Sequence, residues 1–193
     1  MSNRSLTIHT ATLAALFTTA EAKAHLKVDT TADDTLIDNL IRAATESCQI
    51  YTNRYFIHTV VKQQCDHWHD IATLYKSPVS SVAHIKYYDT DNAQQTWAAS
   101  NYIVDTSSKP ARIGLAPDKS FPDIAERLNA IEVQYTVGYG SASENVPEGI
   151  RQAVLLTIGN WYQNRQSVVT GTIATELPLS SQYLLEQYKV QVC

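Results

Sequence analysis

The chain has 193 residues, a formal net charge of −4 and an apolar fraction of 44%, and these values exclude several classes of protein. The length suits one large domain or a domain with an insertion, and the apolar residues suffice for a core. The negative charge argues against broad capture of nucleic acid, which needs a basic surface. Cys48, Cys65 and Cys193 form no disulfide framework and no CxxC motif, so we expect synthesis in a reducing cytoplasm.

The N-terminal stretch MSNRSLTIHTATLAALFTTAEAK does not have the features of a secretory signal. Its apolar run, residues 6–17, is short and is interrupted by His9 and several threonines. No other stretch approaches the roughly 20 apolar residues that a membrane span needs. We therefore expect no contact with a membrane.

Residues 18–56 are predicted to be helical. Thr18 and Glu21 fit a capping box that opens a first short helix. After the polar break DTTADD, Thr31 or Asp33 can cap a second helix. Its apolar side chains recur at spacings of three and four along one stripe. That stripe consists of Leu36, Ile37, Leu40, Ile41, Ala44, Cys48 and Tyr51.

Residues 57–137 change to short runs that are rich in β-branched and aromatic side chains. Turn-forming clusters separate these runs, which predicts a set of antiparallel strands. The stretch YYDTDNAQQTW is typical of a hairpin with an Asp-Asn turn. The expected strands are IHTVVKQQC, IATLY, SVAHIKYYD, NYIVD, ARIGL and IEVQYTV.

The last zone begins with a long helix in GIRQAVLLTIGNWYQNRQ. We expect Asn145 to cap it, Pro147 to occupy its first turn and Glu148 to favour its dipole. Residues 166–182 carry no helical signal and are expected to form a mobile or extended arm. The chain then ends with the short amphipathic piece QYLLEQYK.

The stretch CDHWHD offers several groups that can bind a metal. On one strand, Cys65, His67 and His69 would share a face, but the first and last would lie roughly 13 Å apart. Zinc holds its ligands at about 2.0–2.3 Å, so on one straight strand these three cannot surround one ion, and His67 and His69 would need a third ligand such as His84 or Asp89. In a turn a metal site is geometrically easier, but no spacing rule supports it. His67 and His69 can bind adventitious nickel or zinc. Our preferred interpretation is a polar strand end whose Trp68 packs inward.

Other catalytic patterns are missing from the sequence. It contains no GxSxG, HExxH, Walker or GxGxxG motif. The carboxylate pairs Asp33–Asp34 and Asp89–Asp91 belong to an expected helix start and an expected hairpin turn. Structural roles are therefore favoured for both pairs, and no catalytic constellation stands out in the sequence.

Six segments, in order, resemble a known family. They are LFTTAEAKAHLKVD, DDTLIDNLIRAATESCQIYTNRYF, SPVSSVAHIKYYD, SNYIVDTSSKPARIGL, AIEVQYTVGYGSASENVPEGIRQAVLLTIGNWYQNRQ and LPLSSQYLLEQYKV. This series resembles the head–tail connector, or adaptor, proteins of long-tailed bacteriophages, and in particular the longer members with a β insertion. CDHWHD lies outside that pattern, and Lys189 stands where the family usually has an arginine.

The resemblance implies a structural protein of the virion neck, made in the cytoplasm of the bacterial host. It also implies that the protein is not an enzyme, with no catalytic residue and no cofactor. Such adaptors form a ring, commonly twelve-fold, beneath the portal protein. They extend the DNA channel and present a platform to the next neck component or to the tail. Double-stranded DNA would pass through the ring without specific binding.

We therefore predict an α+β fold. Residues 1–56 and 141–193 should form a discontinuous helical core, with residues 57–140 as an antiparallel β insertion. A ring needs a heterologous interface, in which two different patches of each subunit meet. We expect the arm and the C-terminal piece to carry partner contacts, through Thr170, Ile173, Leu177, Leu184, Leu185, Tyr188 and Lys189.

Three alternative functions stay open from the sequence. The first is another neck or tail-completion protein, such as a stopper or a tail terminator. The second is a metal-dependent enzyme that uses His67 and His69. The third is a cytosolic binding module with no role in a virion.

Overall fold

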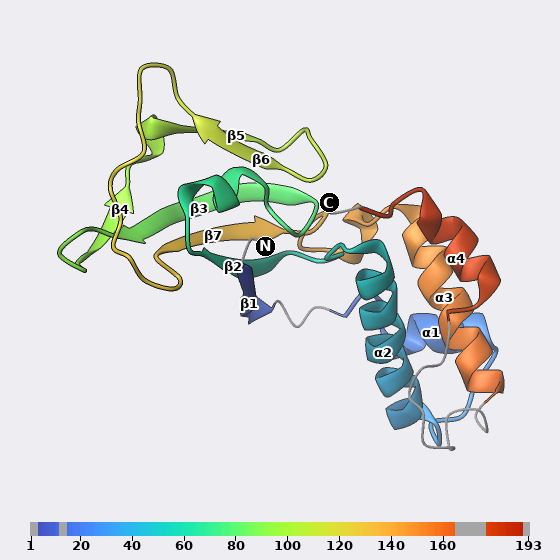
Figure 1. Cartoon of the computed structure of the whole chain (residues 1–193). Helices are drawn as coiled ribbons and strands as arrows, with labels where there is room; N and C mark the ends of the chain where they lie inside the picture. Colours follow the sequence, from blue (N-terminus) through green and yellow to red (C-terminus); the bar gives the residue numbers. More distant parts are fainter. Residues whose placement is uncertain (1–3, 12–14, 165–176, 191–193) are drawn as a thin grey trace. The chain divides into compact units, whose positions relative to one another are not determined.

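The computed structural model describes residues 4–11, 15–164 and 177–190, and it divides the chain into two compact units (Figure 1). The helical unit comprises residues 13–57 and 140–189, and the β unit comprises the remainder of the chain. Helices and antiparallel strands are both present, so the predicted α+β class is confirmed. Among the described residues, no helix is long and apolar enough to cross a bilayer.

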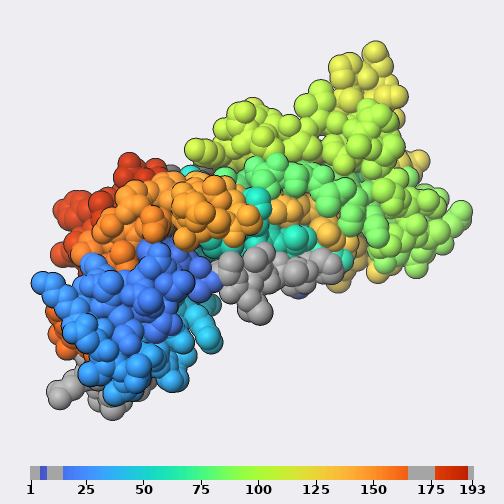
Figure 2. Space-filling model, turned by 180° about the vertical axis from the view of Figure 1, so that it is seen from behind, coloured from blue at the N-terminus to red at the C-terminus, as the bar shows by residue number. Residues whose placement is uncertain are grey.

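The described part of the helical unit contains four α-helices, of which α3 packs against the other three. Their bounds are α1 Thr19–Leu26, α2 Asp34–Thr52, α3 Glu148–Gln163 and α4 Leu179–Glu186. In Figure 2, α1 and the start of α2 (blue) are visible on this unit together with α3 (orange) and α4 (red). The helical unit is thus a small bundle around a central helix.

The start of α1 is the capping box that the sequence predicts. The Thr18 hydroxyl accepts from the Glu21 amide at 3.2 Å, and the Thr18 amide donates to the Glu21 carboxylate at 2.7 Å. The bond from the Thr18 amide, and a second from the Thr18 hydroxyl to the same carboxylate at 2.8 Å, lower the pKa of Glu21. The start of α2 differs in detail, because Asp33 precedes the helix without capping it. Its carboxylate accepts instead from the Tyr162 hydroxyl, at 2.7 Å, and so ties α2 to α3.

The core of the helical unit lies between α2 and α3. Cys48, on the predicted apolar stripe, is fully buried and lies 4.0 Å from the Thr157 hydroxyl, so it is a small core residue. Burial raises the pKa of its thiol to about 12. The two helices bury Ile37, Ile41, Ala44, Cys48, Thr52, Ile150, Ala153, Val154, Thr157, Ile158 and Trp161.

The expected cap of α3 is wrong. Pro147 is the residue that precedes the helix, and Asn145 ends a short 3-10 turn, η3 (Ser143–Asn145). The Asn145 side chain accepts from the Ala142 amide at 3.3 Å, so it stabilises the turn. Both Asn145 and Pro147 fit a helix start, and the proline lies closer to the first helical residue.

The β unit contains a five-stranded antiparallel sheet with the order β1-β2-β7-β3-β4. A separate hairpin pairs β5 with β6. Residues of β2 and β7 alternate strictly between buried and half-buried, as a sheet with one covered face requires. The strands are β1 Arg4–Ala11, β2 Thr59–Cys65, β3 Val79–Tyr88, β4 Gln94–Trp97, β5 Tyr102–Asp105, β6 Arg112–Leu115 and β7 Ile131–Val137.

Most of the expected strands are present, and so is the expected β3–β4 hairpin. Asn92 takes the left-handed conformation in its turn, with φ 62°, and the Asn92 amide donates to the Asp89 carbonyl at 2.8 Å. One strand was not expected: β1 pairs with β2 along the edge of the sheet. Consequently, Arg4–Ala11 and Val190 group with the β unit, although the sequence placed both with the helices. That residues 1–56 and 141–193 form one domain, and residues 57–140 another, stays a prediction.

The expected strand IATLY is wrong. Its first two residues end a 3-10 helix, η1 (Trp68–Ala72), and the others lie outside any strand. Trp68, Ile71 and Leu74 are all buried. Their spacing of three residues matches the turn of a 3-10 helix, so one apolar side of this segment faces the core without strand geometry.

A fully buried glutamine fastens the segment after η1 to the sheet. Gln63, on β2, donates to the Thr73 carbonyl at 3.1 Å. Its side-chain oxygen accepts from the Tyr75 amide at 3.1 Å and from the Tyr135 hydroxyl at 3.2 Å. Because buried polar groups are costly without partners, this network specifies where the segment lies.

Candidate partner-binding surface

The described part of the helical unit has an exposed apolar hollow between α2 and α4. The hollow measures about 270 Å³. Leu179 and Tyr183 are 72% and 82% exposed, although large apolar side chains are usually covered. We call this hollow the α2–α4 surface and define it by the residues that line it, which are Tyr51, Leu179, Gln182, Tyr183 and Glu186.

The α2–α4 surface has one polar edge. The Tyr51 hydroxyl donates to Glu186 Oε2 at 2.7 Å, and this hydrogen bond raises the pKa of Tyr51. Lys189 Nζ lies 4.7 Å from the centre of the Tyr51 ring and 4.0 Å from the Glu186 carboxylate. The charged groups are exposed, so this edge adds orientation more than stability.

The C-terminal end of α2 positions this edge. Asn53 takes the left-handed conformation, with φ 54°, and ends the helix. The next residue, Arg54, is buried, and its Nε donates to the carbonyl of Tyr188. Residues 51–54 (Tyr-Thr-Asn-Arg) and 188–189 (Tyr-Lys) therefore lie next to each other, although they are far apart along the chain.

The inner side of α4 is fixed to α3. Ser181 is fully buried, and its hydroxyl donates to the Ala153 carbonyl at 3.0 Å and lies 3.0 Å from the Thr157 hydroxyl. Leu185 is also fully buried. Gly149 leaves room for the Tyr188 ring, since a Cβ there would lie 3.0 Å from the Tyr188 hydroxyl. Because the inner side of α4 is bound to α3 in this way, Leu179 and Tyr183 on its opposite side point to solvent.

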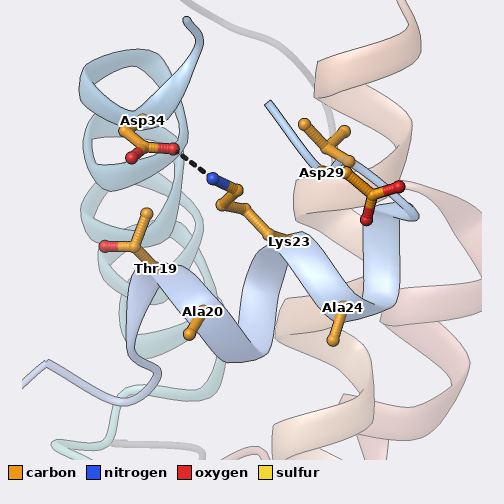
Figure 3. Close-up of a pocket in the computed structure, with 7 residues that line it drawn as sticks. Thr19, Ala20, Lys23, Ala24, Asp29 and Asp34 are labelled. Carbon is orange, nitrogen blue, oxygen red and sulfur yellow. Dashed lines mark hydrogen bonds and ion pairs between the residues drawn. The ribbon is translucent and has the colours of Figure 1, made fainter. Parts of the chain in front are cut away.

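A second hollow, of about 480 Å³, lies beside α1 (Figure 3). Lys23 points across it and forms an ion pair with Asp34 at 2.7 Å. The Thr19 hydroxyl donates to Asp38 on α2. These contacts join α1 to α2 and satisfy the cation, so the arrangement explains packing and indicates no ligand chemistry.

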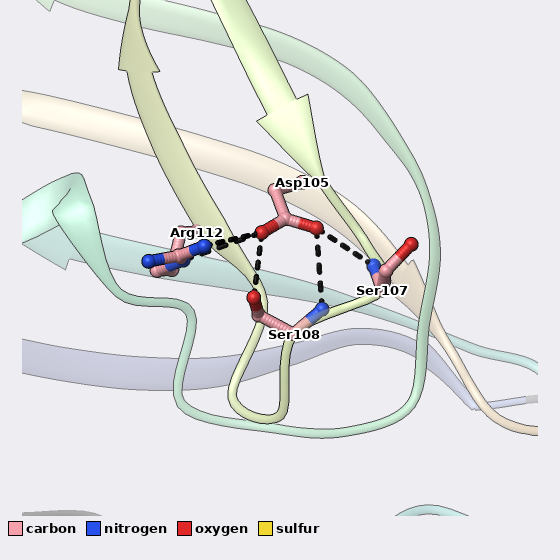
Figure 4. A network of polar contacts seen from close by, with 4 residues as sticks. All are labelled: Asp105, Ser107, Ser108 and Arg112. Carbon is pink, nitrogen blue, oxygen red and sulfur yellow. Dashed lines mark hydrogen bonds and ion pairs between the residues drawn. The ribbon is translucent and has the colours of Figure 1, made fainter.

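The tip of the β5–β6 hairpin is organised around one carboxylate (Figure 4). Asp105 accepts from the Ser107 and Ser108 amides at 3.0 and 3.2 Å, and from the Ser108 hydroxyl at 2.6 Å. Arg112 Nη2 donates to it at 2.7 Å. These donors, with the Ser108 hydroxyl and Arg112 foremost, hold the pKa of Asp105 well below its usual range.

The CDHWHD stretch does not form a metal site in the described structure. Cys65 is buried at the end of β2, whereas His67 and His69 are exposed, and His69 contacts Asp70 at 3.0 Å. Trp68 packs inward and donates to the Pro122 carbonyl at 2.8 Å. Among the described residues, no group of three or more His, Cys, Asp or Glu side chains could hold a metal ion.

The predicted partner-contact residues divide into three groups. Thr170 and Ile173 lie outside the described residues. Leu177, Leu184 and Tyr188 are half-buried and Lys189 is exposed, whereas Leu185 is fully buried against the bundle.

Sequence reasoning missed Leu179, Tyr183 and Tyr51. The row Leu179, Gln182, Tyr183 and Glu186 follows a helical spacing of three and four, but this spacing alone does not tell which side of a short helix faces the core. The expected arm, residues 166–182, is wrong at its end, because residues 179–182 form the start of α4. Residues 166–176 of the arm lie outside the described residues.

The model of the head completion protein family matches residues 15–189. The chain belongs to the head completion protein family. This membership confirms the resemblance to phage connector proteins, and with it the prediction of a structural protein that completes the head at the neck of the virion. No curated protein sequence is significantly similar to this chain.

Three solved structures share the fold. A chain in the neck of an empty gene transfer agent (GTA) particle, computed with C6 symmetry, has a TM-score of 0.78 at 22% identity and is covered to 97%, with 98% of this chain covered. A chain of the native GTA virion has a TM-score of 0.77 at 22% identity, with 97% of this chain and 96% of that chain covered. A third, from the native GTA neck computed with C12 symmetry, has a TM-score of 0.74 at 20% identity, with coverages of 98% and 97%.

Proposed function

We propose that this head completion protein forms a ring beneath the portal of a long-tailed phage, where it lengthens the DNA channel and joins the head to the tail. One observation carries the proposal. The family model spans residues 15–189, and the same fold, over 98% of this chain, is found in a protein from a particle neck that was computed with C6 symmetry. The proposed partners are the portal, further copies of the chain, and the next neck component or the tail.

The chemistry of the chain supports a structural role. Its organised carboxylates have packing partners: Glu21 caps α1, Asp33 ties α2 to α3, and Asp105 holds a hairpin tip. A net charge of −4 would also limit non-specific retention of DNA as it passes. That the protein is not an enzyme and needs no cofactor stays a prediction.

The proposed contacts with the portal and the next neck component lie on the C-terminal part of the chain. Half-buried Leu177, Leu184 and Tyr188, together with exposed Lys189, are available for such contacts. Leu185 is fully buried, and we propose that it holds α4 in place instead. Thr170 and Ile173 remain proposed contacts outside the described residues.

Electron microscopy of a lysate in which this gene is disrupted tests the proposal. We expect DNA-filled or leaking heads beside separate, complete tails, and a plasmid copy of the gene should restore joined particles. Purified portal should retain the protein from such a complemented lysate if it is an adaptor, whereas a stopper or tail terminator would bind a later component. Intact, infectious virions without the gene would overturn the proposal.

A further inference from the structure

The α2–α4 surface needs a partner that is apolar and uncharged over most of its length. Leu179, Tyr183 and the ring of Tyr51 supply its apolar part. The charged side chains at the hollow, Glu186 and the neighbouring Lys189, lie at one edge and already contact Tyr51. A charged occupant would find no opposite charge in the centre of the hollow and would lose its own hydration.

The chain itself contains a segment with this chemistry. Residues 167–175 read SVVTGTIAT and contain no charged side chain, and β-branched residues make up most of the segment. Charged residues, Arg165 and Glu176, flank it on both sides. Such a segment can bind in an extended form, burying its valines and isoleucine while its ends stay in water.

The connection to α4 favours a segment from another copy. The Gln182 amide donates to the Pro178 carbonyl at 3.0 Å, and the Gln182 side chain donates to the Leu177 carbonyl at 2.6 Å. These hydrogen bonds fix Leu177 and Pro178, the two residues that precede α4, at the N-terminal end of the helix. To cover Tyr183 and Glu186, the subunit's own segment would have to double back along α4.

From these observations we propose that the α2–α4 surface binds residues 167–175 of a second copy of this chain. The proposal rests on the proposed ring, and it supplies the two different patches that a heterologous interface needs. Each subunit carries one surface and one segment, so each copy gives its segment to one neighbour and receives another. When this series of contacts closes, it gives a ring in which every interface is heterologous and none is isologous.

A labelled peptide with the sequence of residues 165–178, RQSVVTGTIATELP, tests the proposal on the full-length protein. We expect saturable binding by fluorescence anisotropy, and at least tenfold weaker binding to the Tyr183→Asp and Leu179→Asp variants. Ile50→Asp is the matched control, because Ile50 is 71% exposed on α2 but does not line the hollow. Circular dichroism should show that all three variants are folded.

Each other outcome overturns the proposal. Binding that Tyr183→Asp leaves unchanged would place the peptide elsewhere. Binding to an Ile173→Asp chain but not to the native chain, with both chains monomeric by size-exclusion chromatography, would show that each subunit fills its own surface. No binding to either chain would remove the segment as the occupant. The peptide assay and the gene disruption can fail independently. If the peptide does not bind but the gene disruption separates heads from tails, only this proposal is rejected. If the peptide binds but the gene disruption leaves infectious virions, only the proposed role in the neck is rejected.

Discussion

Replacing Gln63 by leucine should destabilise the β unit markedly, although the two side chains have similar size. The change removes the hydrogen bonds of the side chain to the Thr73 carbonyl, the Tyr75 amide and the Tyr135 hydroxyl. A buried hydrogen bond contributes about 1 kcal/mol, and a buried group left without its partner costs up to about 3 kcal/mol. We therefore expect the free energy of unfolding to fall by about 3 kcal/mol.

Urea unfolding followed by tryptophan fluorescence measures this loss. Trp68 and Trp97 lie in the β unit and pack against each other at 4.8 Å between ring centres, so their emission reports on that unit. Gln94→Leu, on the exposed strand β4, is the control and should change stability by less than about 0.5 kcal/mol. A loss below about 1 kcal/mol for Gln63→Leu would refute the reasoning, since the segment would then be held by apolar packing alone.

Three further predictions concern single positions. Ser181→Ala should lower the free energy of unfolding by about 1–2 kcal/mol in urea, because it removes the buried bond from α4 to α3, whereas exposed Ser180→Ala should have no effect. Gly159→Ala should raise it by about 0.5–1 kcal/mol, since the new Cβ would meet only His25, at an ordinary 3.6 Å; a lower midpoint would show that the helices are closer than described. The lowered pKa of Asp105 means that its contribution is present at neutral pH and is lost as the pH falls below the usual carboxyl range. The protection of the β5–β6 amides from hydrogen exchange, taken relative to their intrinsic exchange rates at each pH, should therefore fall in acid, and Asp105→Asn should abolish that fall.

Local signals in the sequence predict the elements that local chemistry determines. Thr18 and Glu21 form the expected capping box, and the stripe through Cys48 is the buried side of α2. The hairpin turn at Asn92 follows from residue types that tolerate the left-handed conformation. In each case the deciding contacts lie within a few residues of the signal.

The misplaced elements depend on contacts between distant residues. β1 forms only because β2 offers an edge, and Ile71 is buried in a 3-10 turn because Gln63 holds the following residues to the sheet. The candidate surface was missed for the same reason. Buried Ser181 and exposed Tyr183 are chosen by the partners that α3 offers to α4, and a periodic pattern does not contain that information.

The pairing of Ile57 with Gly140 has a consequence for how new parts can be added to this protein. The two residues form a parallel bridge, so the chain leaves the helical unit and returns to it at neighbouring points. Neighbouring strands lie about 4.8 Å apart, a gap that two or three residues can close. The length of the segment between the two residues, 58–139, can therefore change without moving Ile57 and Gly140 apart. Insertions within residues 58–139 that keep β2, the partner of β1, thus leave the ends of the segment where the helical unit holds them.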